Sequence, residues 1–170
     1  QEKIRPLALA MVESRSPMRS LEYTCNDLSL GFVLESVLPF ARQNLDLINI
    51  EHHPGAFSVL GASMGGSMAL YAGLRLPGIF GQVLSLSGAF SFPDYDLVVY
   101  DLVRSADPHA LRIWMNAGIY DFPHLLESNR RMSALLQERG YDVWYAEYPA
   151  GHNYTAWRDE IESGLIHLFA

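Results

Sequence analysis

Residues 56–77 read AFSVLGASMGGSMALYAGLRLP and predict a strand, a tight turn and a helix in direct succession. The first seven residues are almost continuously apolar, which is typical of a parallel strand that is buried on both faces. Helix-favouring residues then run from Ser63 to Leu76, and Pro77 ends the helix. A chain that passes from a buried strand straight into a helix indicates an α/β fold.

The rest of the chain repeats this alternation. Four more apolar runs predict strands, at residues 6–13, 82–87, 111–117 and 142–148. Three more helical patterns are found at residues 27–42, 124–139 and 155–169. We therefore expect a mostly parallel sheet of about five strands with helices on both faces, and with the chemistry at the carboxyl ends of the strands.

Length and composition indicate one ordinary globular domain over residues 1–170, because no linker or repeat interrupts the chain. The net charge is −7 and the longest basic run is Arg130-Arg131, which argues against nucleic acid or an anionic membrane as a partner and favours a small molecule. The oligomeric state stays open. The single cysteine, Cys25, excludes an internal disulfide; it leaves secreted and periplasmic locations open beside the slightly favoured cytoplasm.

The turn after the first quoted strand contains the pattern Gly61-x-Ser63-x-Gly65. A serine in such a strand-to-helix turn exposes its hydroxyl, and the flanking glycines let strand and helix approach each other. Ser63 is therefore the candidate nucleophile. The alternative is a glycine-rich turn that only packs a helix on the sheet.

A serine hydroxyl becomes a good nucleophile when an imidazole accepts its proton. Among six histidines, His152 is the best candidate, because it follows the last predicted strand in a loop of small residues at the edge where Ser63 emerges. A solvated loop histidine is the alternative.

The third group of such a triad is an acid that orients the histidine, and Asp121 follows the preceding strand in the chain order serine, acid, histidine. Asp142 and Glu147 are weaker rivals, because one lies at the amino end of the last strand and the other within it. Asp121 could instead cap the helix after Phe122. No spacing of His, Cys, Asp and Glu suggests a metal site, and no cofactor is expected.

Taken together, these segments resemble the branch of the α/β hydrolases that includes esterase D, feruloyl esterases, enterochelin-type siderophore esterases and mycolyltransferases. The matching segments are RSLEYTCN (19–26), ESVLP (35–39), GASMGGSMALYAGLRLPGIFG (61–81), VLSLSGAF (83–90), NAGIYD (116–121) and GHNYTAWRDEI (151–161). The resemblance implies a three-layer α/β-hydrolase sandwich with Ser63, Asp121 and His152 as the triad and the Met64 N–H as an oxyanion donor.

The resemblance also matches Arg19, Glu22 and Trp157 to positions that shape the acyl pocket of relatives. Each has a structural alternative: Arg19 and Glu22 could pair to order their loop, and Trp157 could pack over the histidine loop.

Relatives carry additional strands before the one matched to residues 6–13, and one of these lies beside the strand that precedes the serine and supplies a second oxyanion donor. Nothing in this sequence corresponds to that strand. Either the first strands of the full fold are missing, or the strand predicted at residues 6–13 lies next to the strand before Ser63 and its loop, near residues 13–15, supplies a substitute donor. The expected function is a serine carboxylic-ester hydrolase that forms an acyl-enzyme on short-chain or aromatic, feruloyl-like esters. A siderophore trilactone esterase and a non-catalytic binding or scaffold domain are the alternatives.

Overall fold

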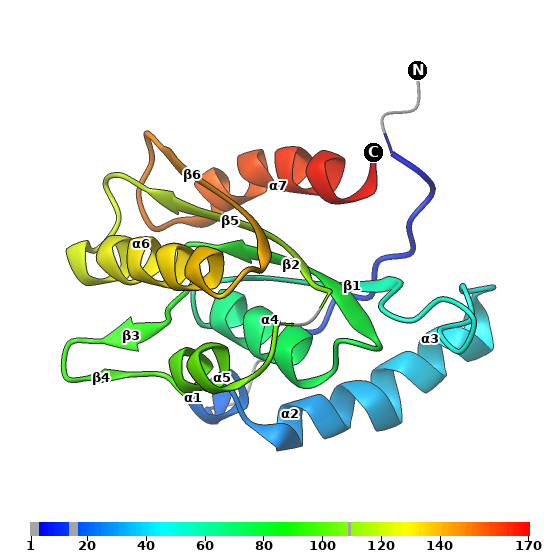
Figure 1. The fold of residues 1–170 in the computed structure, drawn as a ribbon. Helices are drawn as coiled ribbons and strands as arrows, with labels where there is room; N and C mark the ends of the chain where they lie inside the picture. The colour runs from blue at the N-terminus through cyan, green and yellow to red at the C-terminus, as the bar shows by residue number, and fades with distance from the viewer. Residues whose placement is uncertain (1–3, 14–16, 109) are drawn as a thin grey trace.

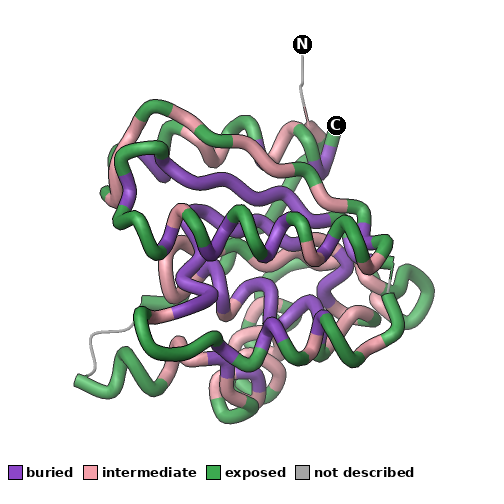
Figure 2. The backbone as a smooth tube through the Cα atoms, turned by 60° about the vertical axis from the view of Figure 1, so that its left-hand side comes forward, coloured by how far each residue is buried: buried purple, intermediate pink, exposed green. Residues whose placement is uncertain are grey.

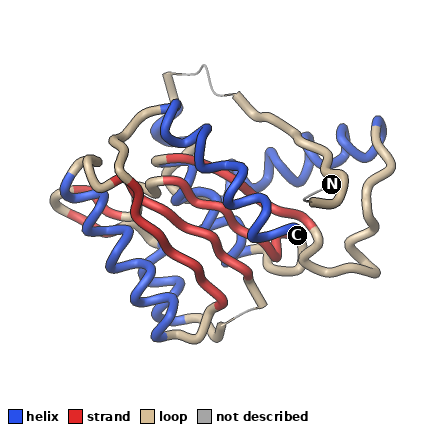
Figure 3. The backbone as a smooth tube through the Cα atoms, turned by 90° about the horizontal axis from the view of Figure 1, so that it is seen from above, coloured by secondary structure: helices blue, strands red, loops and turns tan. Residues whose placement is uncertain are grey.

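The structure, a computed structural model, describes residues 4–13, 17–108 and 110–170. In this part of the chain, the main sheet consists of four parallel strands in the order β1-β2-β5-β6 (Figures 1 and 3). Their bounds are Phe57–Ala62, Phe80–Leu86, Arg112–Gly118 and Asp142–Tyr148. All four carboxyl ends therefore lie at one edge of the sheet, as an α/β fold requires.

Helices cover both faces of this sheet, which confirms the predicted three-layer α/β-hydrolase-like fold. On one face α4 (Met64–Arg75), α5 (Val99–Ser105) and α6 (Pro123–Glu138) enclose a core that includes Leu70, Val83 and Met132. On the other face α7 (Tyr154–Phe169) packs on Leu84 and Trp114. Neighbouring residues of β2 thus face opposite cores, and Figure 2 shows the buried strands between exposed helix surfaces.

The predicted strand at residues 6–13 is wrong, and the main sheet has four strands where about five were expected. Residues 6–13 have no regular secondary structure and are exposed, with Met11 86% accessible. An apolar run forms a strand only when it hydrogen-bonds to a neighbouring strand, and residues 6–13 do not pair with the unpaired edge of β1. Figure 1 shows the amino-terminal segment running past the end of α7, where Arg5 lies 5.3 Å from the Phe169 ring centroid.

The predicted helix at residues 27–42 forms as one continuous helical run with an irregular centre. It consists of α2 (Asp27–Phe32), a π-helical turn (Val33–Val37) and α3 (Leu38–Asn44). Pro39 explains the irregularity, because proline has no N–H and its ring crowds the carbonyl one turn earlier. The short helix α1 (Arg19–Glu22) precedes this run.

A two-stranded antiparallel hairpin, β3 (Ser91–Phe92) and β4 (Tyr95–Asp96), lies between β2 and α5. The sequence analysis did not predict either this hairpin or α5. In the residues that the structure describes, no helix is both long and apolar enough to cross a membrane.

Candidate active site

Ser63 stands between the end of β1 and the start of α4 in a backbone conformation that serine rarely adopts, with φ 57° and ψ −123°. The turn is held by its own backbone, since the Ser63 carbonyl accepts hydrogen bonds from Gly66 and Ala89 at 2.9 Å each. A side chain at Gly61 would collide with the Gly65 carbonyl. The glycine pattern therefore makes the strained turn sterically feasible, as the sequence predicted.

The loops that carry Asp121 and His152 are tied together at the carboxyl ends of β5 and β6. The Tyr120 N–H donates to the Ala150 carbonyl at 3.0 Å, and any side chain at Gly118 would meet that same carbonyl. Asp121 and His152, which are far apart in sequence, thereby become neighbours. This close backbone approach fixes the distance between the acid and the histidine.

The structure brings all three predicted triad residues into one chain of hydrogen bonds. His152 Nε2 lies 2.9 Å from Ser63 Oγ, and His152 Nδ1 lies 2.9 Å from Asp121 Oδ1 and 3.1 Å from Oδ2. A neutral imidazole with its proton on Nδ1 satisfies both contacts, since it donates to the carboxylate and accepts from the hydroxyl. The arrangement can move a proton from the serine to the histidine.

The Asp121 side chain is completely buried, whereas that of His152 is 17% exposed. Burial raises the pKa of the Asp121 carboxyl, but the His152 ring, the Phe122 N–H at 2.7 Å and the nearby Ser87 hydroxyl outweigh burial and hold the pKa below its usual 3.8. Asp121 is therefore charged at neutral pH and can balance a positive charge on His152.

Met64 begins α4, so its N–H belongs to the first turn of the helix, where amide groups have no intrahelical acceptor. The amides of Gly66 and Ser67 both turn back to the Ser63 carbonyl. Within the described ranges, no hydrogen bond from the Met64 N–H is found. The second donor, predicted near residues 13–15, falls largely outside the described residues, because 14–16 are not among them.

Aromatic side chains surround the histidine. The Trp157 ring meets the His152 ring edge-on at a centroid distance of 4.8 Å, and Phe122 lies 5.4 Å from it. Trp157 is only 8% exposed, so it packs over the histidine loop, whereas Phe122 is 56% and Tyr154 81% exposed. The sequence analysis overlooked Phe122 and Tyr154, although both stand within two residues of a predicted triad member.

Arg19 and Glu22 are the first and last residues of α1. The Arg19 guanidinium stacks over the Tyr23 ring at 5.6 Å, and the Tyr23 ring in turn approaches Gly65 beside the serine turn. The Glu22 carbonyl accepts hydrogen bonds from Ser29 Oγ and Asn26 Nδ2. These contacts order the loop between α1 and α2 and connect Arg19 to the serine turn through Tyr23.

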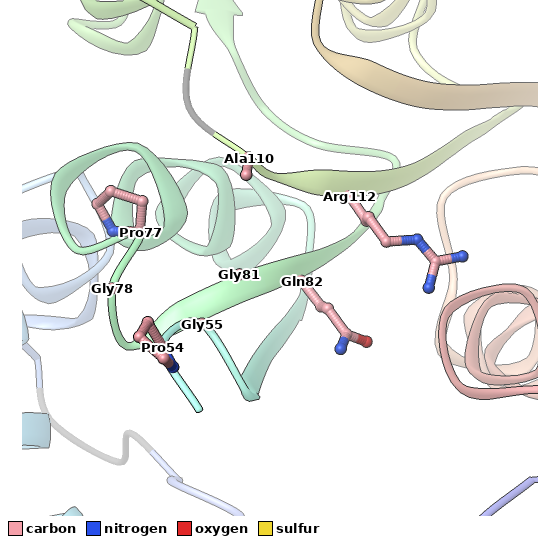
Figure 4. Close-up of a pocket in the computed structure, with 8 residues that line it drawn as sticks. All are labelled: Pro54, Gly55, Pro77, Gly78, Gly81, Gln82, Ala110 and Arg112. Atoms are coloured by element: carbon pink, nitrogen blue, oxygen red, sulfur yellow. The ribbon is translucent and has the colours of Figure 1, made fainter. Parts of the chain in front are cut away.

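A cavity of about 410 Å³ lies at the opposite edge of the sheet, near the amino ends of β1, β2 and β5 (Figure 4). Its lining residues include Gly55, Gln82 and Arg112 and none of the triad. Across the described ranges, no cluster of three or more His, Cys, Asp or Glu side chains could hold a metal ion.

The chain is similar to known esterases in sequence and in fold. The sequence model of the family described as "Putative esterase" matches residues 16–168. Iron(III) enterobactin esterase of Escherichia coli (strain K12) is 34% identical over 176 residues, which cover 99% of this chain and 43% of that protein. The corresponding esterase of Dickeya dadantii (strain 3937) is 29% identical over 88% of this chain and 37% of its own length. The chain thus spans less than half the length of these relatives.

Solved structures of esterases are also similar to this chain. The enterobactin esterase FES from Shigella flexneri, determined in the presence of enterobactin, superposes with a TM-score of 0.80 at 30% identity over 90% of this chain and 40% of that chain. A ferulic acid esterase shares the fold, with a TM-score of 0.69 at 21% identity over 82% of this chain and 60% of its own. The fold, the serine turn and the match over residues 16–168 lead to one conclusion: the chain belongs to the "Putative esterase" family of α/β hydrolases.

Proposed function

We propose that this chain carries the reaction centre of a serine carboxylic-ester hydrolase, with Ser63 as nucleophile, His152 as general base and Asp121 as the acid that orients it. The observation that supports this most strongly is the unbroken contact from Ser63 Oγ through the His152 ring to Asp121, with a 2.9 Å separation at each step. Nucleophile, base and orienting group in mutual hydrogen-bond reach are what acyl transfer requires.

The reaction would proceed in two steps. His152 Nε2 takes the Ser63 proton as Oγ attacks the ester carbonyl, and the same proton then passes to the leaving alcohol. Water, activated by His152 in the same way, cleaves the resulting acyl-enzyme. The Met64 N–H would hold the negative oxygen that develops in each step, because it points from the helix start with no acceptor of its own.

Among substrates, we propose a siderophore ester of the enterobactin kind ahead of a feruloyl-like or short-chain ester. The relatives described above at 34% and 30% identity are enterobactin esterases, whereas the ferulic acid esterase has only 21% identity and supports the fold alone. Exposed Tyr120, Phe122 and Tyr154 beside the triad offer aromatic faces on which an aryl acyl group can stack. Either aromatic ester fits this surface chemically, so the assay must compare them.

Turnover of enterobactin, methyl ferulate and a short-chain p-nitrophenyl ester should be measured with the wild-type chain and with Ser63→Ala. We expect the substitution to lower turnover of the preferred ester by at least about a thousandfold, because the nucleophile is lost. Turnover that survives in Ser63→Ala would refute Ser63 as nucleophile. No turnover of any ester by the folded wild-type chain would favour a binding or scaffold domain.

A further inference from the structure

Ser87 is the residue that follows β2, in the segment VLSLSGAF, and its position mirrors that of Ser63. Ala62 of β1 pairs with Leu86 of β2, so the residues after these two strands are neighbours at the carboxyl edge of the sheet. Ser87 has a φ of 46°, and its N–H donates to the Asn116 carbonyl at 2.9 Å. A non-glycine residue in this left-handed region carries strain, and such strain is concentrated at functional sites.

The Ser87 side chain is completely buried next to the acid of the triad. Its hydroxyl and that of Tyr148 are buried with no partner within hydrogen-bonding geometry in the described structure. Backbone contacts place these groups together, because the Ser87 N–H bonds Asn116 of β5, the Asp121 N–H bonds the Gly118 carbonyl at 3.1 Å, and Gly118 pairs with Tyr148. In keeping with this proximity, Ser87 acts to lower the pKa of Asp121 and that of Tyr148. Buried hydroxyl groups rarely stay unpaired, so a small rotation that pairs them is favourable.

Asp121 has acceptor capacity to spare. A carboxylate offers about four lone-pair positions. The Phe122 N–H takes one on Oδ1, and the single Nδ1–H of His152 is shared between the two oxygens at 2.9 and 3.1 Å. The side chain is fully buried, so solvent does not compete for the remaining positions on Oδ2.

We propose that Ser87 is a positioning residue of the triad: its hydroxyl donates a hydrogen bond to the Asp121 carboxylate and accepts one from the Tyr148 hydroxyl. This inference rests on the proposed function, because Ser87 would act only through Asp121 and His152. The hydrogen bond would keep the carboxylate charged and aimed at Nδ1. The left-handed backbone at Ser87 would be retained because it directs the hydroxyl to the acid.

The charged and titratable groups around Asp121 determine which group donates and which accepts each of these hydrogen bonds. His152 faces it from the loop after β6, Tyr148 from the end of β6 and Glu160 from α7, where it accepts from Asn116 Nδ2 at 3.4 Å. Burial, then the charges of Glu160 and Asp121, raise the pKa of Tyr148 above its usual 10.0. Tyr148 therefore stays neutral and donates, and the ionised Asp121 accepts.

The test compares Ser87→Ala with Ser87→Gly. Both remove the hydroxyl, but only glycine relieves the backbone strain, so it should unfold at a higher urea concentration than the alanine variant. We expect kcat to fall about tenfold in both variants, the size of one lost hydrogen bond to a charged group. We also expect the pKa of the Asp121 carboxyl, followed by carbon NMR, to rise in both.

A wild-type kcat and a wild-type Asp121 pKa in Ser87→Gly would overturn the proposal, because the role would then be one of backbone shape alone. If neither Ser87 variant folds, Ser87→Cys decides, because a thiol is a much weaker donor than a hydroxyl: an unchanged Asp121 pKa overturns the proposal and a raised one supports it. Loss of the proposed function itself would be visible separately, as a wild-type turnover that Ser63→Ala does not reduce, while the NMR titration would still report on the hydrogen bond.

Discussion

Asp121 couples the proposed chemistry to the stability of the fold. Its pKa is raised by burial and lowered more strongly by the His152 ring, the Phe122 N–H and Ser87, so in the folded state it lies below the unfolded value of 3.8. A carboxyl with a lowered folded pKa stabilises the native state at every pH above its unfolded value. That contribution disappears as the pH falls through the folded pKa.

We therefore predict that the urea midpoint of the wild-type chain falls as the pH is lowered below about 4. In Asp121→Asn, which keeps the shape of the side chain, the same acidification should reduce the midpoint less. Urea unfolding followed by tryptophan fluorescence across this pH range measures both. Parallel curves for the two proteins would contradict the account of Asp121.

Cys25 offers a second test at single-residue resolution. It is 7% exposed, and burial raises the pKa of its thiol from 9.0 to about 12, although a hydrogen bond with Ser67 acts in the opposite direction. Because the thiolate is the reactive form, we predict that a disulfide reagent such as DTNB modifies Cys25 at neutral pH only after unfolding. Rapid modification of the folded chain would show that the loop between α1 and α2 opens readily.

At the scale of elements, the Arg112 side chain links the end of α7 to the sheet by hydrogen bonds. The Arg112 guanidinium, on the first residue of β5, donates to the carbonyls of Leu168 and His167 at 2.9 Å each. These carbonyls belong to the last turn of the helix, where no intrahelical donor is available and a positive charge is favourable.

Arg112→Met should destabilise the chain by about 1 to 2 kcal/mol, because both charge-assisted hydrogen bonds are lost while most of the apolar stem is kept. The matched control is Arg158→Met, whose ion pair with Asp159 at 2.7 Å lies on an exposed surface. That substitution should cost about 0.5 kcal/mol or less. Urea unfolding of the two variants measures the difference, and equal costs would mean that Arg112 does not fasten α7.

Some strands were predicted correctly from the sequence and one was not. Residues 142–148 were predicted as a strand and form β6 with the same bounds, although β6 lies at the edge of the sheet and has no fully buried residue. Residues 6–13 also have an apolar pattern, but they pair with no strand, although one edge of β1 is unpaired in the described part of the chain. Pairing depends on a partner elsewhere in the chain, and local composition does not contain that information.

The candidate site could be anticipated because each triad residue follows a recognisable strand. Ser63, Asp121 and His152 come after β1, β5 and β6, and parallel topology brings those ends to one edge. Ser87 and Phe122 were not anticipated, since nothing local marks a serine at φ 46° or an aromatic ring beside the histidine. Their relation to the triad depends on contacts between loops that only the folded chain reveals.

For the molecule as a whole, large apolar side chains are exposed on the segment 6–13 and on β1. The exposed large side chains there include Leu9 at 76%, Met11 at 86% and Leu60 at 39%. In the part of the chain that the structure describes, β1 pairs on one side only, with β2. Apolar patches of this kind are rare on monomeric proteins and bind apolar molecules.

We predict that the folded chain increases the fluorescence of the dye ANS at neutral pH, and that the double substitution Leu9→Ser and Met11→Ser reduces the increase. Dye binding without urea, with unfolding still cooperative, would locate the effect on the native surface. An absence of dye binding by the wild-type chain would mean that this surface is covered in solution.

The claim at the centre of this account is that Ser63 is a nucleophile activated by His152. Labelling with a fluorophosphonate, followed by mass spectrometry of the intact protein and its peptides, tests it most directly, because the probe reports nucleophilicity without requiring the natural ester. The account predicts one adduct on Ser63 in the wild-type chain, much slower labelling in His152→Ala and none in Ser63→Ala. An adduct elsewhere, or equal labelling rates in the wild type and His152→Ala, would contradict it.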